Sequence, residues 1–372
     1  MASFSELGIH KNYIKGLKEL NIVNPTEIQE AVIPVLLESK TDLIGLAQTG
    51  TGKTAAFGLP VLHAIDTTNP EVQALIIAPT RELVQQIQKQ LFKFTKYIDA
   101  KIFSEGVYGG EKIDRQIKNL TRTTHIVVAT PGRLLDLVER EAVDISNVKI
   151  LVLDEADEML SMGFKEDLTK ILQYNTKKRN TWLFSATMPT EIKNIVKNYM
   201  SKEAIRVEVN KNALVNENIS HHYIQTTIKD KLNLITRILD RRPNERGIIF
   251  CRTKAGTKAL AEQLQKEGFA VGALEGDMQQ KDRDKVMRAF KNESLQVLIS
   301  TDVSARGIDV NNLGFVLHHQ LPEHLDYYTH RSGRTARAGK TGQSIALIIP
   351  GEMQKIIDTQ KALGITFREL TM

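Results

Sequence analysis

The chain has 372 residues, more than a single hydrophobic core usually serves, so two domains are expected. Hydrophobic residues make up 41% of the sequence, and the single cysteine, Cys251, excludes a disulfide framework and fits a reducing compartment. Fifty basic residues against 44 acidic ones give a formal net charge of +6, which permits nucleic-acid binding without requiring it. No apolar run approaches the roughly 20 residues of a membrane helix and no secretory leader is visible, so a cytoplasmic protein without a membrane association is expected.

Along the first half of the chain, short aliphatic runs alternate with longer amphipathic ones. The strand-like runs lie at 43–46, 74–78, 125–129, 150–153 and 181–184. Their nearly continuous apolar character indicates strands that are covered on both faces, and the alternation indicates parallel strands joined by crossover helices. Each run ends at a polar cluster, which is where open parallel sheets bind their ligands.

The pattern is interrupted at 209–218, a polar stretch rich in asparagine that has no periodicity and is typical of a linker. It resumes with strand-like runs at 247–250, 297–300 and 344–348. The sequence therefore predicts an α/β protein in which an N-terminal domain, 1–208, is joined by a flexible linker to a C-terminal domain, 219–372.

Residues 47–54 (AQTGTGKT) follow a strand-like run and begin an amphipathic one, which is the context of a phosphate-binding loop. The strict pattern begins with glycine, where this chain has Ala47. Gly50 and Gly52 allow backbone amides to wrap a phosphate, Lys53 provides an ammonium group for the β- and γ-phosphates, and Thr54 provides a hydroxyl for Mg²⁺. The alternative is an ordinary Gly/Thr turn before a helix.

Two further clusters carry charge. Asp154 and Glu155 follow an apolar run, as a metal-binding carboxylate and a water-polarising neighbour would, although such pairs are also common helix N-caps. Near the C-terminus, residues 330–337 (HRSGRTAR) carry three arginines at intervals of three, a pattern that suits contact with a polyanion. A phosphate loop and a distant arginine cluster imply a site that is completed from two parts of the chain and can open and close.

The ordered set of motifs resembles the DEAD-box RNA helicases, whose name is spelled by residues 154–157. The other motifs that match in the first half are 25–29, 47–54, 79–83, 109–110, 130–133 and 185–187. Those in the second half are 249–253, 280–283, 301–309 and 330–337. The resemblance covers nearly the whole chain and implies a minimal core of bacterial type with two RecA-like domains in tandem.

The resemblance also implies roles for particular residues. Residues implied to bind ATP are Phe4, Gln29, Gln48, Thr49, Gly50, Thr51, Gly52, Lys53, Thr54 and Asp309, where Gln29 would read adenine through its planar amide. Those implied in catalysis are Glu155, Lys53, Arg334 and Arg337, with Thr54 and Asp154 holding Mg²⁺ largely through water. Those implied to couple the nucleotide state to RNA are Asp157, Ser185, Thr187 and His330. Those implied to grip the RNA backbone, and so to read little sequence, are Arg81, Gly110, Thr130, Arg133, Arg283 and Thr301.

The activity implied is RNA-dependent ATP hydrolysis that unwinds or remodels RNA, by a monomer that works with RNA-processing or ribosome-assembly partners. One alternative is a DNA-directed helicase, against which the Gln29 segment and the full DEAD spelling argue. The other is an ATP-switched RNA clamp, against which Glu155, Arg334 and Arg337 argue. Three positions depart from the family pattern. Ile22 stands where an aromatic residue is frequent, so weaker stacking on adenine is expected. Ser332 replaces an aliphatic residue, and Ala336 replaces a glycine, for which altered dynamics are expected.

Two histidine pairs, 221–222 and 318–319, suggest a metal site at first sight. Adjacent residues of a strand point to opposite faces of the sheet, and no cysteine lies nearby in the sequence. Ordinary structural histidines are therefore expected at these positions.

Overall fold

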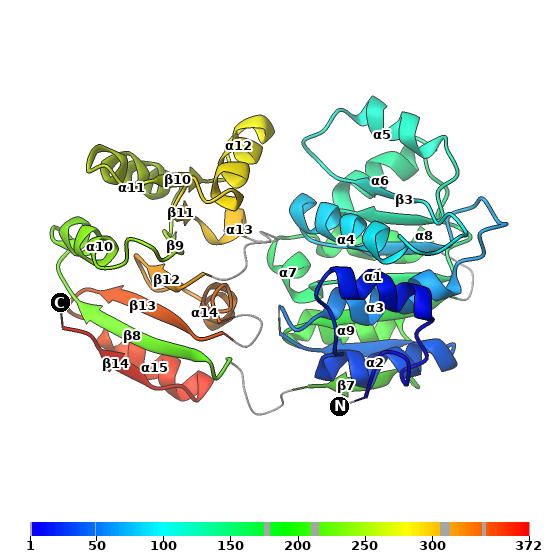
Figure 1. Cartoon of the computed structure of the whole chain (residues 1–372), viewed down its shortest axis with the longest axis horizontal. Coiled ribbons are helices and arrows are strands. Elements are labelled where there is room, and N and C mark those ends of the chain that lie inside the picture. The colour runs from blue at the N-terminus through cyan, green and yellow to red at the C-terminus, as the bar shows by residue number, and fades with distance from the viewer. Residues whose placement is uncertain are drawn as a thin grey trace. The chain divides into compact units, whose positions relative to one another are not determined.

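The computed structural model describes residues 2–48, 50–174, 179–209, 216–305, 313–336 and 340–371. The chain divides into two compact units, Met1–Val209 (unit 1) and Asn210–Met372 (unit 2) (Figure 1). Most of the predicted linker, 209–218, lies outside the described residues.

Unit 1 is built on a parallel sheet in the strand order β3-β4-β2-β5-β6-β1-β7. Its strands are β1 (Leu43–Leu46), β2 (Ala74–Ile77), β3 (Ser104–Val107), β4 (Ile126–Ala129), β5 (Ile150–Leu153), β6 (Asn180–Ser185) and β7 (Ile205–Glu208). Its helices are α1 (Lys11–Glu19), α2 (Glu27–Glu38), α3 (Lys53–Ala64), α4 (Arg81–Phe94), α5 (Ile113–Leu120), α6 (Pro131–Glu139), α7 (Ala156–Ser161), α8 (Lys165–Tyr174) and α9 (Thr190–Tyr199). The predicted α/β fold with a parallel sheet is confirmed.

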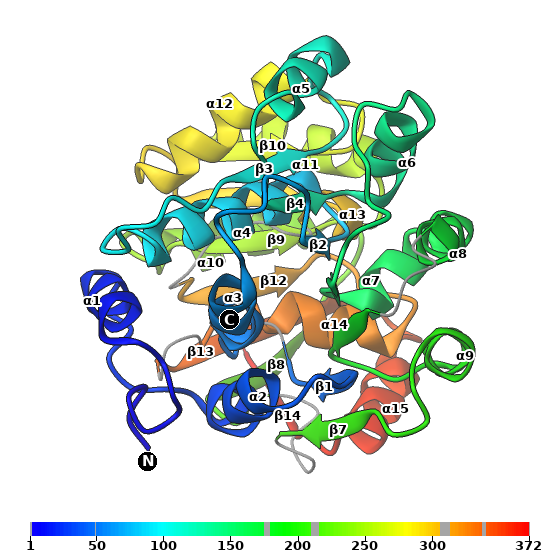
Figure 2. The ribbon, with the colours of Figure 1, turned by 90° about the vertical axis from the view of Figure 1, so that its right-hand side faces the viewer.

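Both faces of this sheet are covered, which is why its central strands are apolar throughout. Val152 and Trp182 belong to a core that lies beneath α1 to α4, whereas Leu151 and Leu183 belong to a core beneath α6 to α9. Figure 2 shows α1 to α3 on one side of the sheet and α6 to α9 on the other. The sequence did not predict β3 and β7, the two edge strands, because an edge strand need not be apolar: β3 carries the half-buried Glu105 and β7 the exposed Glu208.

Unit 2 contains a second parallel sheet, in the order β10-β11-β9-β12-β13-β8-β14. Its strands are β8 (Ile219–Gln225), β9 (Gly247–Phe250), β10 (Val271–Leu274), β11 (Val297–Ser300), β12 (Phe315–His318), β13 (Gly342–Ile348) and β14 (Phe367–Glu369). Its helices are α10 (Lys231–Asp240), α11 (Lys254–Lys266), α12 (Gln280–Lys291), α13 (Asp302–Ala305), α14 (Leu325–Ser332) and α15 (Met353–Leu363). No described helix is long and apolar enough to cross a membrane.

The two sheets have the same strand order. When the seven strands of each unit are counted along the chain, both sheets read third, fourth, second, fifth, sixth, first and seventh. The units therefore repeat one topology without a visible sequence repeat, and corresponding turns can be compared between them.

Asp42 connects the starts of three strands in unit 1. It precedes β1, it is 7% exposed, and its carboxylate accepts hydrogen bonds from the Thr181 amide on β6 and the Ser201 amide ahead of β7, each at 2.6 Å. A buried amide that loses its acceptor costs about 1–3 kcal/mol, so this carboxylate stabilises the packing of β1 against its neighbours β6 and β7.

We expect Asp42→Ala to lower the free energy of unfolding of unit 1 by roughly 1–3 kcal/mol, mainly because the buried Thr181 amide is left without an acceptor. Asp42→Asn should cost less, since the amide oxygen keeps one of the two bonds. The only tryptophan, Trp182, is buried in unit 1, so urea unfolding followed by its fluorescence reports on this unit. Exposed Asp99 provides the control, and an Asp42→Ala midpoint equal to that of Asp99→Ala would contradict the expectation.

Candidate active site

The phosphate loop connects β1 to α3 and is held by the start of α2. The Thr26 hydroxyl donates to the Thr51 carbonyl at 2.7 Å, and the Gln29 side-chain amide donates to the Gly52 carbonyl at 2.9 Å. Gly50 and Gly52 have φ of 83° and 92°, and a β-carbon at Gly52 would lie 2.4 Å from Gln29 Nε2. Only glycine fits at position 52, because the loop passes so close to α2.

The side-chain amide of Gln29 is fully engaged in this structure. Its oxygen accepts from the Thr26 amide at 3.0 Å while its nitrogen holds Gly52, and the residue is 2% exposed. Thr26 and Gln29 form a capping box at the start of α2, and the T-x-x-Q spacing in the sequence was the signal that could have revealed the role of Thr26. The predicted contact of Gln29 with adenine stays a prediction.

Other residues predicted to bind ATP are placed as follows. The carbonyl of Gln48 accepts from the Thr51 hydroxyl at 2.8 Å, and Thr49 lies outside the described residues. Phe4 is 2% exposed and packs in the core with α1 and α2, so it presents little ring surface in this structure. Asp309 also lies outside the described residues.

Lys53 and Asp154 are two buried ionisable groups beside the phosphate loop. Lys53 is the first residue of α3, is 6% exposed, and donates to the Ala47 carbonyl at 3.1 Å. Asp154 follows β5 and is 2% exposed. Burial raises the pKa of Asp154 to about 7, even though the nearby Lys53 ammonium acts in the opposite direction, and the charges of Glu155 and Asp157 raise it further.

Glu155 has a strained backbone. Its φ of 50° and ψ of 51° place it in the left-handed region as the N-cap of α7, and its amide donates to Asp154 Oδ1 at 3.0 Å. For a residue with a side chain this conformation costs about 1–2 kcal/mol. Such strain is concentrated at functional sites, where the surrounding structure holds it in place.

Asp157 joins the DEAD segment to the turn after β6. Its carboxylate accepts from the Thr187 amide at 2.8 Å, the Thr187 hydroxyl at 2.9 Å and the Ala186 amide at 3.2 Å. In return, the Asp157 amide donates to the Ser185 hydroxyl at 3.3 Å. The structure therefore brings together three of the four predicted coupling residues, and a change at one turn reaches the other directly. The fourth, His330, lies in α14 of unit 2.

The residues of unit 1 predicted to grip RNA also lie close together, after β2, β3 and β4. The Arg81 guanidinium packs against Gly110, since a β-carbon on Gly110 would lie 2.7 Å from Arg81 Nη1. Arg133 donates to the Glu111 carbonyl at 3.2 Å, which fixes the segment that contains Gly110. Thr130 is the N-cap of α6, which carries Arg133.

In unit 2 the predicted RNA-binding residues meet at α13. Arg283 donates to the Ser304 carbonyl at 2.6 Å, and the Thr301 hydroxyl donates to the Ser304 hydroxyl at 3.0 Å. Because Arg283 and Thr301 are 5% and 8% exposed, they brace α13 in this structure, and their contact with RNA stays a prediction. Arg334 is 7% exposed just after α14, and Arg337 lies outside the described residues.

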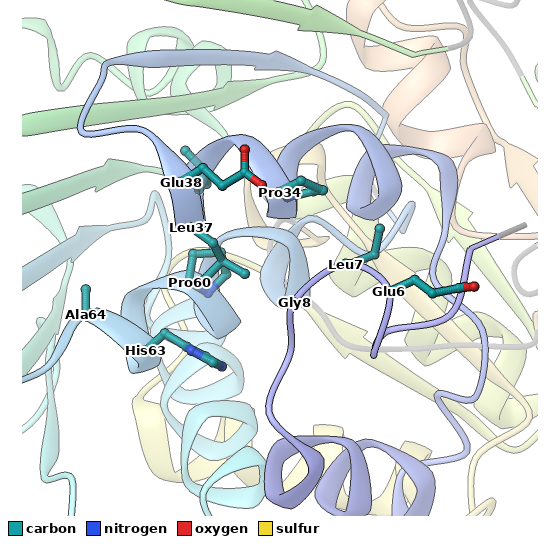
Figure 3. Close-up of a pocket in the computed structure, with 10 residues that line it drawn as sticks. Glu6, Leu7, Gly8, Pro34, Leu37, Glu38, Pro60, His63 and Ala64 are labelled. Carbon is teal, nitrogen blue, oxygen red and sulfur yellow. The ribbon is translucent and has the colours of Figure 1, made fainter.

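A pocket of about 390 Å³ lies at the far ends of the two helices that border the phosphate loop (Figure 3). Pro34 of α2 and Pro60 and His63 of α3 line it together with Leu7. The pocket begins five residues beyond Gln29 and seven beyond Lys53, about 8 and 11 Å along the two helices at 1.5 Å per residue, so it lies away from the phosphate loop.

Two parallel-sheet units of one topology, the first with a phosphate loop and carboxylates at its strand ends, define a tandem RecA-like ATPase of the helicase type. Residues 26–195 match the DEAD/DEAH box helicase family, and residues 230–339 match the helicase conserved C-terminal domain. The chain belongs to the DEAD-box family of ATP-dependent RNA helicases.

Two bacterial relatives illustrate the match. The chain is 43% identical to the ATP-dependent RNA helicase CshA of Limosilactobacillus reuteri, over 96% of this chain and 71% of that protein. It is 40% identical to the DEAD-box ATP-dependent RNA helicase CshA of Geobacillus kaustophilus (strain HTA426), over 96% of this chain and 75% of that protein. The chain thus spans about seven tenths of the length of these relatives.

Solved structures of the same family share the fold. S. cerevisiae Dbp5 bound to RNA and ADP BeF3 is 31% identical, with a TM-score of 0.91 over 100% of this chain and 96% of that one. Mss116p bound to ssRNA and AMP-PNP is 29% identical, with a TM-score of 0.88 over 100% of this chain and 80% of that one. Both likenesses extend over the two units.

The raised pKa of Asp154 has a measurable consequence. Between its ordinary pKa of 3.8 in the unfolded chain and about 7 in the folded chain, the folded protein holds one more proton. Stability due to this group therefore falls as pH rises through that window, by up to ~1.4 kcal/mol per pH unit, and stays level above it. We expect Asp154→Asn, which has no proton to lose, to become progressively more stable than the parent from pH 5 to about pH 7.

The measurement is urea unfolding of ligand-free protein in EDTA, followed by Trp182 fluorescence at pH 5, 6, 7 and 8. A stability difference that does not change with pH would show that the carboxyl of Asp154 titrates at its ordinary value. Chelation matters, because a bound cation would favour the ionised carboxylate.

Proposed function

We propose that this chain hydrolyses ATP in a reaction stimulated by RNA, and that it uses hydrolysis to separate short RNA duplexes or to remodel RNA–protein complexes. The observation that carries the proposal is the bonding of Asp157 to Ala186 and Thr187. These bonds join the turn after β5, which carries Asp154 and Glu155, to the turn after β6. A change at the nucleotide would therefore be transmitted along the edge of the sheet where the predicted RNA contacts of unit 1 lie. The titles of the Dbp5 and Mss116p structures, which name RNA and a nucleotide together, support it.

ATP binds through the phosphate loop. The amides of Gly50 to Lys53 surround the phosphates at the positive end of α3, and the Lys53 ammonium exchanges the Ala47 carbonyl for phosphate oxygens. Gln29, which already holds Gly52, reads the adenine base. Binding of the base and ordering of the loop are therefore linked through one side chain.

Mg²⁺ accompanies the nucleotide, and the residues present fit it. Magnesium prefers oxygen ligands and is usually held by one or two carboxylates together with substrate phosphates. Among the described residues no three His, Cys, Asp or Glu side chains form a metal cluster, whereas the buried Asp154 carboxylate lacks a full counter-charge and lies beside the loop that carries Thr54. Asp154 and Thr54 would hold the ion, largely through water, and it would neutralise phosphate charge.

Glu155 acts as the base that orients and polarises the attacking water. Its left-handed backbone fixes the direction in which the side chain leaves the turn after β5. Arg334 and Arg337, from the second domain, neutralise the charge that develops on the γ-phosphate, and Asp309 contacts the ribose. ATP is thus bound in a cleft between the two domains, and the RNA backbone lies along both.

RNA is gripped through its backbone by Arg81, Gly110, Thr130, Arg133 and their counterparts in unit 2, so the core reads little sequence. Selectivity for a physiological RNA then comes from partners in RNA processing or ribosome assembly. The protein works as a monomer in the cytoplasm.

We expect Glu155→Gln to bind ATP normally but to slow hydrolysis by at least a hundredfold, an increase in barrier of about 3 kcal/mol, because the amide keeps the shape but loses the charge. The variant should also stay on RNA in the presence of ATP. The measurements are steady-state ATPase with saturating RNA, nucleotide affinity, and RNA retention. Exposed Glu166→Gln is the matched control. Near-normal turnover in Glu155→Gln would show that the base is misassigned.

The same preparation distinguishes the alternative activities. ATP hydrolysis should be stimulated by single-stranded RNA and not by DNA of the same sequence, and the protein should displace a short RNA strand from a duplex when ATP is present. Equal stimulation by DNA would favour a DNA-directed helicase. Stimulation by RNA without strand displacement would favour an ATP-switched clamp.

We also expect the two domains to approach each other only when ATP and RNA are both bound, because binding of both ligands supplies the energy that holds the domains together. Fluorescent maleimides on Asp99→Cys and Lys266→Cys, both exposed, would report the distance by energy transfer. Burial raises the pKa of Cys251 to about 12 and shields its thiol, so the native cysteine stays unlabelled at pH 7. Energy transfer that is the same in all ligand states would contradict closure.

A further inference from the structure

Five polar side chains are buried together beneath α14, and the resemblance to the family gives none of them a role. They are His221, His318, Tyr328, Ser332 and Ser344, called the polar cluster below, and none is more than 6% exposed. Ser344 is central: its hydroxyl lies 2.9 Å from His318 Nε2, 2.9 Å from the Ser332 hydroxyl and 3.2 Å from the Tyr328 hydroxyl. Tyr328 continues the cluster to His221 Nδ1 at 2.7 Å.

The register of the sheet explains why these groups meet. Ser344 on β13 is paired with His221 on β8, and His318 on β12 is paired with Ala346, two residues further along β13. Residues paired in parallel strands, and those two apart, share a face, so His221, His318 and Ser344 all face α14. His222, the next residue along β8, faces the other way.

The polar cluster touches Arg331, which is 2% exposed. Arg331 makes a two-pronged ion pair with Asp302 (Nε to Oδ1 at 2.5 Å, Nη2 to Oδ2 at 2.7 Å), and its third nitrogen, Nη1, donates to the Gln320 carbonyl at 2.9 Å. Nη1 also lies 3.4 Å from His318 Nδ1. The guanidinium is thus held by Asp302 on one side and by His318 on the other.

The direction of these hydrogen bonds follows from Arg331. A guanidinium has donors and no acceptor, so His318 Nδ1 must accept, which leaves the ring proton on Nε2 to be donated to Ser344. Burial and the Arg331 charge hold the pKa of His318 well below its usual range, so the ring stays neutral. Ser344 therefore fixes the orientation of the His318 ring, and the ring fixes Arg331.

Arg331 and Asp302 link a segment predicted to bind RNA to a segment predicted to take part in ATP hydrolysis. Asp302 begins α13 directly after Thr301, a predicted RNA contact, while Arg331 lies in α14 between His330 and Arg334. We propose that His318 and Ser344 are positioning residues for ATP hydrolysis. They orient Arg331 toward Asp302, and this ion pair fixes the position of α14 relative to α13. This rests on the proposed function.

Ser344→Ala and Tyr328→Phe form the test, because each removes one buried hydroxyl from the polar cluster. Only Ser344→Ala removes the partner of His318 Nε2, and with it the path that runs from Ser344 through His318 to Arg331. We expect Ser344→Ala to lower the RNA-stimulated kcat tenfold or more, with the KM for ATP and the affinity for RNA within about twofold, because small displacements of catalytic groups are costly. Tyr328→Phe should lose thermal stability to a similar extent yet keep kcat, and Ser344→Thr, which keeps the hydroxyl, should restore it.

The outcomes separate cleanly. If the parent protein shows no RNA-stimulated hydrolysis, the proposed function fails. If the parent is stimulated but Ser344→Ala keeps kcat, or both variants lose kcat in proportion to their melting temperatures, the cluster is structural and the inference is overturned. If Ser344→Ala does not fold, His318→Asn and His318→Gln replace it, because Asn keeps an acceptor near the Nδ1 position and Gln keeps a donor near the Nε2 position. His318→Asn should then retain more kcat than His318→Gln, and the reverse order would overturn the inference.

Discussion

Many of the residues predicted to be functional are placed by one constraint: the strands of a parallel sheet all end at the same edge of that sheet. A crossover helix returns the chain to the opposite edge each time, so the turns after β1, β2, β4, β5 and β6 gather although they are up to about 140 residues apart in the chain. The buried strands can be apolar on both faces because the chemistry is confined to these turns. Asp42 acts at the other edge, where it ties β1 to β6 and β7.

Within that edge, buried charged groups serve as connectors rather than as sources of stability. A buried ion pair often contributes little net stability, because desolvation offsets the attraction. Asp157 connects two turns of unit 1, and Arg331 connects α14 to α13 and β12 in unit 2. If one of these charged groups loses its partners, a buried charge is left uncompensated. The turns or helices that it joins can therefore adopt only the few relative positions in which these bonds are kept.

The sequence predicted features that follow from apolar patterns and motifs. It did not predict contacts between residues that are neighbours only in the folded structure. The central strands of unit 1, the parallel α/β fold and the family followed from apolar runs and ordered motifs, whereas β8 and β12 of unit 2 were not predicted although they lie inside its sheet. The edge strand β7 was not predicted either, because an edge need not be apolar. The sequence also did not reveal the hydrogen bonds from Gln29 to Gly52 and from Arg283 to Ser304, because each joins two segments that only the folded structure brings together. Ser332 looked like an unexplained departure from the family, and its hydrogen bond to Ser344 gives the reason for a hydroxyl there.

The shared topology also gives a physical reason why one nucleotide would serve both units. Lys53 begins the helix after the first strand of unit 1, and Lys231 begins the helix after the first strand of unit 2. In unit 2 no glycine precedes this lysine between β8 and α10, and its ammonium donates to the carbonyls of His319 at 2.5 Å and Leu347 at 3.1 Å. His319 follows the fifth strand, as Asp154 does in unit 1, so a carbonyl stands where a metal-binding carboxylate would be needed. Unit 2 has a lysine at the same place in its topology, but this lysine binds carbonyls of its own unit. Under the proposed function, unit 2 would therefore contribute arginines to a nucleotide that unit 1 binds.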